Sequence, residues 1–310
     1  MPKVNKDPIG LRPYLFHGVN LYMNRIEGEE CPGECPSCGR EDRFSVNINT
    51  SQAQCLHGKC GFSCNASSFM AWLWEHSDAT LDQYTELAQE RRLLYTETLM
   101  HWGVVRSATM PDKWIVPGYS IKPSLCQLYI WARMGKRSRL LATPTLTHQL
   151  HRPTTAGGFN PSKSEIYLCE GPWDAMILWE LLGNAKWNEE GEQLRSSANR
   201  ENNSLLTDAN VMAVPGCLTF SEAWAPLFAE KVVYLLYDSD HPIKSKSGKL
   251  LPPAGQTGMR RVATILAGAV NPPEQIVYLR WGSKGYNKDL PSGFDLRDGL
   301  AITKRLLSSG

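Results

Sequence analysis

Apolar runs of strand length alternate with helical stretches through the second half of the chain. The runs at residues 166–169, 211–216, 232–237 and 276–279 predict strands, and residues 172–182, 220–230 and 257–266 predict helices. Because strand and helix alternate from residue 165 onward, we expect a parallel sheet with right-handed crossovers. Residues 184–210 are polar, rich in Asn, Ser and Glu, and predict a surface insertion or a mobile loop.

The first of these strand–helix junctions carries two carboxylates. In EIYLCEGPWDAMILWELLG, which begins at residue 165, Glu170 ends the strand and Gly171 permits a tight exit. Pro172 suits the first position of a helix, Asp174 falls in its first turn, and Gly183 can close it. Carboxylates at the carboxyl end of a buried strand are where open α/β sheets place their chemistry.

A second pair of carboxylates follows the strand in VVYLLYDSD. Asp238 and Asp240 point the same way in an extended chain, so their charges repel, and a divalent cation is the economical explanation. A third acidic group lies near the end of the sequence, in GFDLRD, where Asp295 and Asp298 are expected at the start of a helix. Asp289 is the alternative candidate for this third acidic position. Together these carboxylates predict a magnesium site.

The N-terminal part of the chain predicts a small metal-binding domain. Six of the nine cysteines lie between residues 31 and 64. Two cysteine knuckles, with the predicted strands RFSVNI and SQAQC between them, give the tetrahedral thiolate set of a structural zinc ribbon. The zinc would replace the core that so short a segment cannot build. The predicted zinc ligands are Cys35, Cys38, Cys55 and Cys60. The candidates for the fourth position are Cys31, His57, Cys60 and Cys64.

The segment between the ribbon and the parallel sheet has an unusual charge pattern. Residues 113–164 contain no Asp or Glu, although the whole chain has a net charge of only +2. A basic segment without acidic residues, next to a carboxylate site, is expected to bind a polyanion or a triphosphate whose other end contacts a metal. The alternative is a solvated basic surface that binds no partner. Alternating apolar residues in WIVPGYSI and QLYIWARM predict strands, hence a mixed α/β subdomain. Its predicted substrate-binding residues are Lys122, Arg133, Lys136, Arg137 and Arg139.

Length and composition limit the class of protein. With 310 residues, of which 42% are hydrophobic, the chain can bury one large core or two smaller ones, and disorder throughout is excluded. No apolar run is long enough to span a bilayer and the first ten residues lack a signal-peptide core, so we expect a cytoplasmic protein without membrane contact. No Walker loop is present, which excludes a helicase motor from this chain.

The order of these motifs resembles a known family. CEGPWDA followed by YDSD looks like the Toprim domain that primases, topoisomerases, certain nucleases and recombination mediators share. The N-terminal CPSC, RFSV and CGFSC, followed by SSFMAWL, is similar to the zinc-binding domain of bacterial and phage primases of the DnaG type. The basic segment resembles the N-terminal part of their RNA polymerase domain. A long loop separates Asp240 from Gly255 and Gly258, glycines that follow the DxD closely in the Toprim pattern.

The resemblance implies a DNA primase that makes short RNA primers from ribonucleoside triphosphates on single-stranded DNA. Asp238 and Asp240 would hold Mg²⁺ or Mn²⁺, and Glu170 would bind metal or help deprotonate the primer's 3′-hydroxyl. The remaining carboxylates implied near the metal are Asp174, Asp295 and Asp298. The basic cluster would grip the triphosphate or template. The ribbon would read a short template sequence, with stacking on aromatics such as Phe44 or Phe62.

The resemblance also implies a domain order and partners. Residues 1–76 would be the template-recognition ribbon, 77–164 the basic N-terminal subdomain of the RNA polymerase domain, and 165–310 the Toprim catalytic domain. A replicative helicase or another replisome protein is the expected protein partner, in the cytoplasm of a bacterium or of a phage-infected host. Two alternatives stay open: a Toprim nuclease using the same carboxylates, and a non-catalytic zinc and Toprim recombination mediator that binds DNA.

Overall fold

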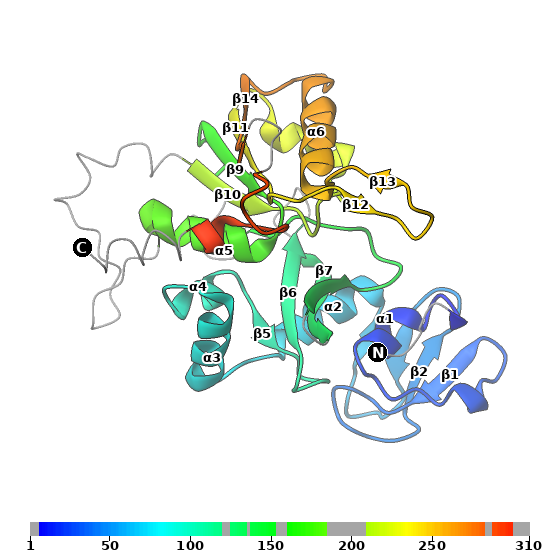
Figure 1. Ribbon diagram of the computed structural model, residues 1–310. Coiled ribbons are helices and arrows are strands. Elements are labelled where there is room, and N and C mark those ends of the chain that lie inside the picture. Colours follow the sequence, from blue (N-terminus) through cyan, green and yellow to red (C-terminus); the bar gives the residue numbers. More distant parts are fainter. Residues whose placement is uncertain are drawn as a thin grey trace. The chain divides into compact units, whose positions relative to one another are not determined.

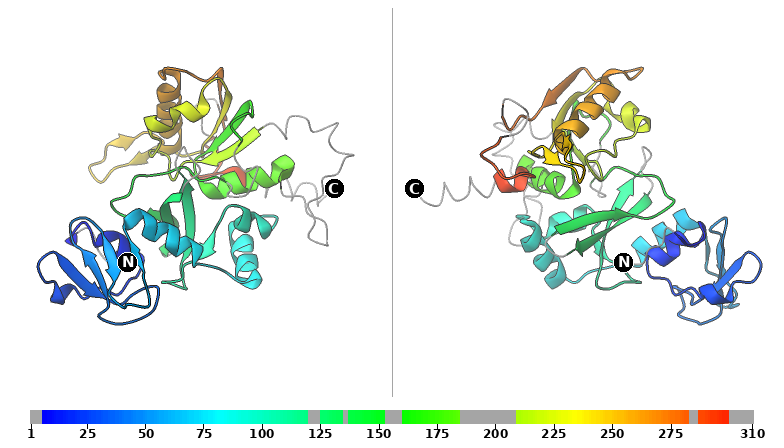
Figure 2. Two further views of the ribbon diagram at one scale, coloured as in Figure 1. Left: turned by 180° about the vertical axis from the view of Figure 1, so that it is seen from behind. Right: turned by 45° about the vertical axis from the view of Figure 1, so that its right-hand side comes forward.

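The protein divides into two compact units. The computed structural model describes residues 6–119, 125–134, 137–152, 160–184, 209–282 and 287–299. The first unit is made of Met1–Ala79 with Val104–Gln149, and the second of Thr80–Gly103 with Leu150–Gly310. Figures 1 and 2 draw both units as ribbon diagrams. The three-domain division expected from the sequence stays a prediction. Among the described residues, no helix has the length and apolar character needed to cross a membrane.

The N-terminal part of the first unit is a small antiparallel sheet in the order β1-β2-β3-β4. Its strands are β1 (Glu30–Gly33), β2 (Phe44–Asn47), β3 (Ala53–Cys55) and β4 (Ser63–Cys64), preceded by α1 (Arg12–Phe16) and the 3-10 helix η2 (Met23–Arg25). The two expected strands are thus the central β2–β3 pair of a four-stranded sheet. Phe44 is 1% exposed and packs edge-on against Tyr14, so it is a core residue rather than a platform for bases.

Helix α2 (Ala66–Glu75) follows the ribbon and packs against a second sheet of the same unit. It begins with a capping box, in which Asn65 Oδ1 accepts the Ser68 N–H and Ser68 Oγ accepts the Asn65 N–H. Phe69, Met70 and Leu73 are fully buried in one core with residues of both sheets. The second sheet is antiparallel and contains, in order, β5 (Val105–Arg106), β6 (Trp114–Tyr119), β7 (Leu125–Met134) and β8 (Arg137–Ala142).

The second unit contains a four-stranded parallel sheet, which confirms the α/β prediction. Its order is β10-β9-β11-β14, and each neighbouring pair is parallel. The strands are β9 (Glu165–Cys169), β10 (Ala209–Ala213), β11 (Val232–Leu236) and β14 (Gln275–Tyr278), and the α-helices that lie between these strands in the sequence are α5 (Pro172–Trp179) and α6 (Ala254–Ala267). Leu168, Val233 and Leu235 are fully buried in one core with Val262 of α6. The central strands β9 and β11 therefore end side by side.

Three segments of the second unit differ from the expected elements. The helix expected to run to residue 182 is α-helical to Trp179 and continues as a π-helical turn, η3 (Glu180–Asn184). The helix expected at residues 220–230 is the 3-10 helix η5 (Glu222–Phe228), whose internal Pro226 has no N–H to donate. The expected loop after Asp240 contains a two-stranded hairpin, β12 (Ile243–Lys244) with β13 (Leu250–Leu251).

Helices α3 (Leu81–Arg91) and α4 (Glu97–His101) also belong to the second unit. The Glu180 side chain, in a residue 3% exposed, accepts hydrogen bonds from the Leu94 N–H at 2.8 Å, the Tyr95 N–H at 3.1 Å and the Thr98 hydroxyl at 2.6 Å. Bonds to a carboxylate are stronger than those between neutral groups. Glu180 therefore ties the α3–α4 connection to the end of α5.

Candidate functional site

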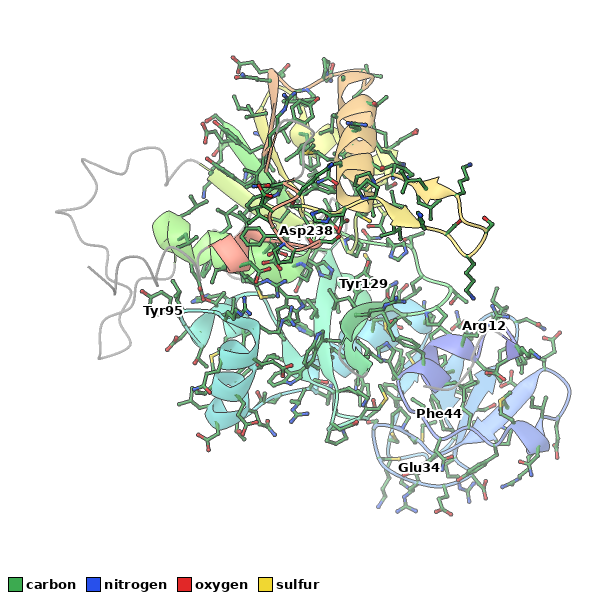
Figure 3. All side chains as sticks on the ribbon, in the orientation of Figure 1. Arg12, Glu34, Phe44, Tyr95, Tyr129 and Asp238 are labelled. Atoms are coloured by element: carbon green, nitrogen blue, oxygen red, sulfur yellow. The ribbon has the colours of Figure 1, made fainter. Side chains whose placement is uncertain are left out.

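Glu170 and Asp238 follow the two central strands of the parallel sheet. Glu170 comes directly after β9 and Asp238 two residues after β11, in a register that pairs Cys169 with Leu236. The Asp238 N–H donates to Oε2 of Glu170 at 3.2 Å, and the Glu170 N–H donates to the Leu236 carbonyl at 3.2 Å. Figure 3 labels Asp238 among the side chains of this unit. The structure thus brings together Glu170 and Asp238, which the sequence singled out at the ends of two different strands.

Asp240 joins this pair through the first turn of α6. Its Oδ2 accepts the Gly255 N–H at 2.8 Å. A Cβ at Gly255 would lie 2.8 Å from the Asp238 carbonyl oxygen, 2.9 Å from Glu170 Oε2 and 3.4 Å from Asp240 Oδ2. The three acidic residues therefore close around a position where a side chain would displace them. We call Glu170, Asp238 and Asp240 the carboxylate cluster.

Burial and mutual repulsion favour the protonated carboxyls of Glu170 and Asp238. Burial, with the added charges of Asp240, Asp174 and Asp295, raises the pKa of Glu170 to about 7, although the Asp238 N–H opposes the rise. Burial and then the charge of Glu170 raise the pKa of Asp238 to about 10. A bound divalent cation would favour the ionised forms. Mg²⁺ prefers oxygen ligands, and the excess negative charge of the cluster suits such an ion.

Asp174 and Asp295 form a neighbouring pair around Arg297. The Arg297 Nε donates to Asp174 Oδ1 at 3.2 Å, and its Nη2 is bonded to Asp295 Oδ2. Both aspartates are 6% exposed. Burial raises the pKa of Asp174 to about 6, while Arg297 lowers it. Arg297 therefore occupies one oxygen of each carboxylate and balances part of their charge, so it competes with a metal for them.

Asp298 has a different arginine partner. Its Oδ1 accepts from Nη1 of Arg92 at 2.6 Å, and its N–H donates to Asp295 Oδ1 at 3.0 Å. Asp295 thus caps a helical turn that starts at the next residue, as the sequence predicts. The competing Asp289 is exposed, and its N–H donates to the Asn287 side chain. Of these late acidic residues, Asp295 is the one whose charge acts on both Glu170 and Asp238.

Two arginines near the carboxylates were missed by sequence reasoning. Arg297 lies between Asp295 and Asp298 in the motif GFDLRD, and an arginine between two aspartates could have indicated an ion pair. Arg91 of α3 lies over the Trp173 ring, 4.8 Å from its centroid. Burial and the nearby Arg297 lower the pKa of Arg91 to about 10, and Asp174 opposes the change. Nothing in the polar pattern of residues 81–91 marks Arg91 as different from its exposed neighbours.

The four predicted cysteines come together in the first unit. The Sγ atoms of Cys35, Cys38, Cys55 and Cys60 lie within 4.8 Å of one another. The Cys35–Cys60 and Cys38–Cys55 separations are 3.9 Å and 3.8 Å. Zn–S bonds of about 2.3 Å at tetrahedral angles place sulfur atoms about 3.8 Å apart. The four thiols therefore fit a structural zinc ion.

The other candidate zinc ligands have different neighbours. The buried Cys31 thiol donates to the Pro32 carbonyl at 3.7 Å, and Cys64 Sγ lies 3.6 Å from the Tyr14 hydroxyl oxygen. His57 lies outside the four-thiol set and contributes its carbonyl oxygen to the Cys60 N–H. Among the described residues, the geometry therefore favours Cys60 as the fourth ligand.

The predicted basic cluster is described only in part. Lys122 and Lys136 lie outside the described residues. Arg133 is on β7 opposite Ser138, and Arg137 begins β8 opposite Met134. Arg139 is exposed on β8, opposite Ala132. The three described arginines are therefore on one antiparallel strand pair.

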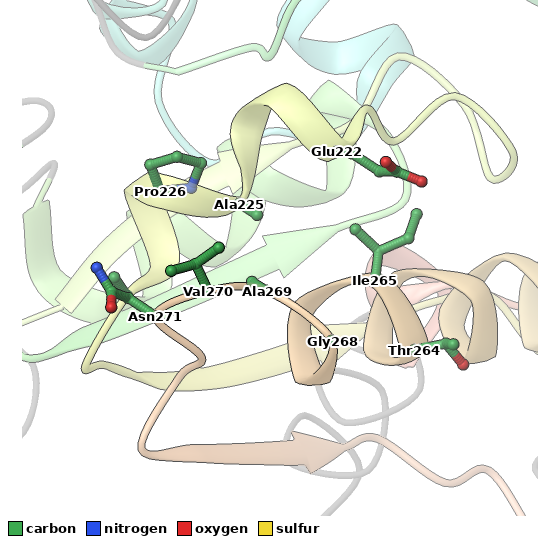
Figure 4. A pocket seen from close by; sticks show the side chains of 10 residues that line it. Glu222, Ala225, Pro226, Thr264, Ile265, Gly268, Ala269, Val270 and Asn271 are labelled. Carbon is green, nitrogen blue, oxygen red and sulfur yellow. The ribbon is translucent and has the colours of Figure 1, made fainter.

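A cavity of about 580 Å³ lies at the other end of α6 (Figure 4). Its lining includes Glu222 and Pro226 of η5, Ile265 of α6 and Val270 in the following turn. Gly268 at the cavity comes thirteen positions after Gly255, which corresponds to about 20 Å along a helix. The carboxylate cluster therefore lies away from this cavity.

Comparison with known proteins gives structural likenesses only. No protein-family description matches the chain, and no curated protein matches its sequence. Among solved structures, the chain is similar to the primase fragment of the bacteriophage T7 primase-helicase protein, at 13% identity and a TM-score of 0.43, over 89% of this chain and 96% of that one.

Two bacterial primase structures are also similar to the chain. A DNA primase domain from Pseudomonas aeruginosa matches at 12% identity and a TM-score of 0.45, over 77% of this chain and 74% of that one. The E. coli primase catalytic core matches at 12% identity and a TM-score of 0.41, over 76% and 74%. At these scores the function has to be inferred from the chain's own residues.

Proposed function

We propose that the chain is a DNA primase, a nucleotidyltransferase that makes short RNA primers from ribonucleoside triphosphates on single-stranded DNA. The observation that carries the proposal is the convergence of Glu170, Asp238 and Asp240 on Gly255 at the carboxyl edge of a parallel sheet. Phosphoryl transfer depends on positioning and charge neutralisation more than on covalent chemistry. A half-buried carboxylate cluster that gains stability from a divalent cation suits this reaction.

Each residue of the cluster has a proposed role. Asp238 and Asp240 hold Mg²⁺ or Mn²⁺, which neutralises charge on the triphosphate and the leaving group. Glu170, with a pKa of about 7, is suited to accept the proton of the primer's 3′-hydroxyl or to complete the metal site. The further proposed ligands Asp174, Asp295 and Asp298 would first exchange an arginine partner.

The first unit supplies the proposed contacts to template and nucleotide. Cys35, Cys38, Cys55 and Cys60 hold zinc, which stabilises the ribbon that selects a template sequence. The basic residues contact phosphates of the template or the incoming triphosphate, because phosphate contacts position a nucleic acid without reading its sequence. These residues are Lys122, Arg133, Lys136, Arg137 and Arg139.

The proposal includes a domain order and a partner. Residues 1–76 form the ribbon, 77–164 the basic subdomain and 165–310 the Toprim catalytic domain. The similar phage chain is named as part of a primase-helicase protein, and we propose that this chain likewise works with a replicative helicase. Its place of action would be the cytoplasm of a bacterium or a phage-infected host.

Incorporation of labelled ribonucleotides on mixed-sequence single-stranded DNA tests the proposal. We expect short RNA products with Mg²⁺ or Mn²⁺ in the wild type, and a loss of at least a hundredfold in Asp238→Ala and in Glu170→Gln, on the order expected for groups that act in the transition state. Shortened template without synthesis would instead identify a nuclease. DNA binding with neither synthesis nor cleavage would favour a mediator-like binding protein.

A further inference from the structure

The β12–β13 hairpin interrupts the chain between two parts of the carboxylate cluster. It occupies residues 243–251, after Asp240 and before Gly255, whose N–H donates to Asp240. It is therefore an insertion at the rim of the cluster. Figure 1 shows the hairpin extending away from α6 and the parallel sheet, and the left view of Figure 2 agrees.

Hydrogen bonds fix both ends of this insertion. At its base, the His241 N–H donates to Ser292 Oγ at 2.9 Å, and His241 Nε2 lies 3.0 Å from the Asn287 carbonyl oxygen. At its tip, the Ser245 N–H donates to the Lys249 carbonyl at 2.8 Å, and Gly248 takes a φ of +81° that favours glycine. The hairpin is therefore an ordered arm with a fixed base.

The arm is strongly basic. Residues 241–273 contain no Asp or Glu, and the hairpin carries Lys244, Lys246 and Lys249. All three lysines are exposed, and in the described parts of the chain none of them forms a salt bridge. Unpaired positive charge beside a cluster of negative charge suits a polyanion held near the cations of that cluster.

Exposed aliphatic side chains accompany the lysines. Ile243 is 60% exposed, Leu250 61% and Leu251 38%. Ile243 pairs with Leu251, and Lys244 with Leu250. A single nucleic-acid strand offers both matching features, phosphates for lysine and base faces for apolar side chains. A free triphosphate lacks a backbone long enough to contact both strands and the tip.

The arm is close enough to act on a strand at the carboxylate cluster. An extended chain rises about 3.3 Å per residue, so Lys244 lies within about 13 Å and Lys246 within about 20 Å of Asp240. A lysine side chain extends this reach. A strand whose reacting end is at Asp238 and Asp240 can therefore reach the hairpin when it runs toward β12.

We propose that the β12–β13 hairpin is a nucleic-acid-binding arm that holds the phosphodiester backbone of a strand at the carboxylate cluster through Lys244, Lys246 and Lys249. This inference rests on the proposed function, because it assigns the arm to the same substrate. The strand is either the template DNA or the RNA–DNA hybrid that forms on it. Both have the same backbone chemistry, and separate binding measurements distinguish them.

Binding of the full chain to a fluorescent single strand and to an RNA–DNA hybrid, without nucleotides, tests the arm. In the triple variant Lys244→Gln/Lys246→Gln/Lys249→Gln we expect the affinity for the strand to fall at least about fivefold. The slope of log affinity against log salt concentration should become shallower by about 2, because each lost phosphate contact on a single strand removes about 0.7 from it. The matched Arg triple variant keeps the charge and is expected to bind like the wild type. Arg260→Gln, on the exposed side of α6, controls for loss of one charge.

The outcomes separate this proposal from the primase proposal. An unchanged affinity and salt slope in the Gln triple variant would show that the hairpin is a solvated loop. Equal weakening in the Arg triple variant would show that shape rather than charge matters, and would also overturn the proposal. Weakening on the single strand alone assigns the arm to the template, and on the hybrid alone to the product. Because binding needs no catalysis, a chain that makes no primers can still pass this test.

Discussion

The backbone N–H of Asp238 donates to the Glu170 carboxylate at 3.2 Å and so joins the ends of two neighbouring parallel strands. Because the donor is a backbone group, replacing the Asp238 side chain leaves this bond in place. Glu170 therefore keeps its position in Asp238→Asn and Asp238→Ala. A change of activity in these variants reports on the Asp238 carboxylate itself.

Gly255→Ala should disrupt the carboxylate cluster. The new Cβ would lie 2.8 Å from the Asp238 carbonyl oxygen and 2.9 Å from Glu170 Oε2, so both groups must move. We expect a loss of about 1 to 3 kcal/mol of stability, as overpacking typically costs, together with a clear loss of Mn²⁺ affinity in calorimetric titration. Gly268→Ala, at the other end of α6, is the control because its Cβ meets only helix carbonyl oxygens at 3.3 Å and beyond. Wild-type metal affinity in Gly255→Ala would contradict the assigned site.

The stability of the metal-free chain should fall as the pH rises from about 5 to about 8. The pKa of Glu170 rises from 4.5 to about 7 and that of Asp238 from 3.8 to about 10, so the folded chain holds more protons than the unfolded chain in this range. Each proton held only by the folded state makes unfolding easier at higher pH. The measurement is the melting temperature against pH, with and without Mg²⁺.

The difference between wild type and Asp238→Asn isolates this effect from other titrations. The variant should show a flatter pH dependence, and Mg²⁺ should stabilise the wild type more at pH 8 than at pH 5, because metal binding competes with protons. Identical pH profiles for the two proteins, with no stabilisation by Mg²⁺, would rule out the coupling between these carboxyls and a metal.

Arg297→Ala should destabilise the second unit far more than Arg92→Ala. Arg297 pairs with Asp174 and Asp295, which are both 6% exposed, so its loss leaves buried charges unpaired at a cost of about 3 to 5 kcal/mol. Arg92 pairs with Asp298 at the surface, where such pairs contribute below about 1 kcal/mol. Urea unfolding of the two variants makes the comparison. Equal losses of unfolding free energy in the two variants would show that the buried ion pairs contribute no more to stability than the exposed one.

Cys38→Ser should release zinc and unfold the ribbon. The four thiols surround one position at tetrahedral spacing, and a zinc ion bound there contributes directly to the folding of this small sheet. We expect zinc content to fall from about one ion per chain to near zero, with a lower melting temperature for the first unit. Cys126→Ser on β7 lies outside the four-thiol set and should retain zinc. Full zinc content in Cys38→Ser would point to a different ligand set.

The sequence was most informative where local pattern determines structure. Buried apolar runs predicted the parallel strands. The acidic residues that follow two of these runs predicted Glu170 after β9 and Asp238 after β11 as site residues. Two cysteine knuckles likewise identified the thiol set, because ligand spacing is a local property. The central part of each candidate site could therefore be predicted without coordinates.

Tertiary pairing was beyond the reach of sequence patterns. Arg297 neutralises Asp174, a residue far away in the chain, and no periodicity encodes this contact. The sequence predicted a loop at residues 243–251 because the strands there are only two residues long and lie at the surface, so they produce no alternating apolar pattern. Pro226 was a local signal against a regular helix in η5, and it was outweighed by the apolar residues around it.

The measurement that tests the central claim most directly is RNA synthesis on circular single-stranded DNA, a template without ends to extend or label. With Mg²⁺ and ribonucleoside triphosphates, the wild type should give short labelled products that ribonuclease degrades, and Asp238→Asn should give almost none. The products should also disappear when zinc is removed, because the ribbon selects the template. Absence of labelled RNA from the zinc-loaded wild type on every template and with every divalent metal tried, or equal synthesis by Asp238→Asn, would contradict the account.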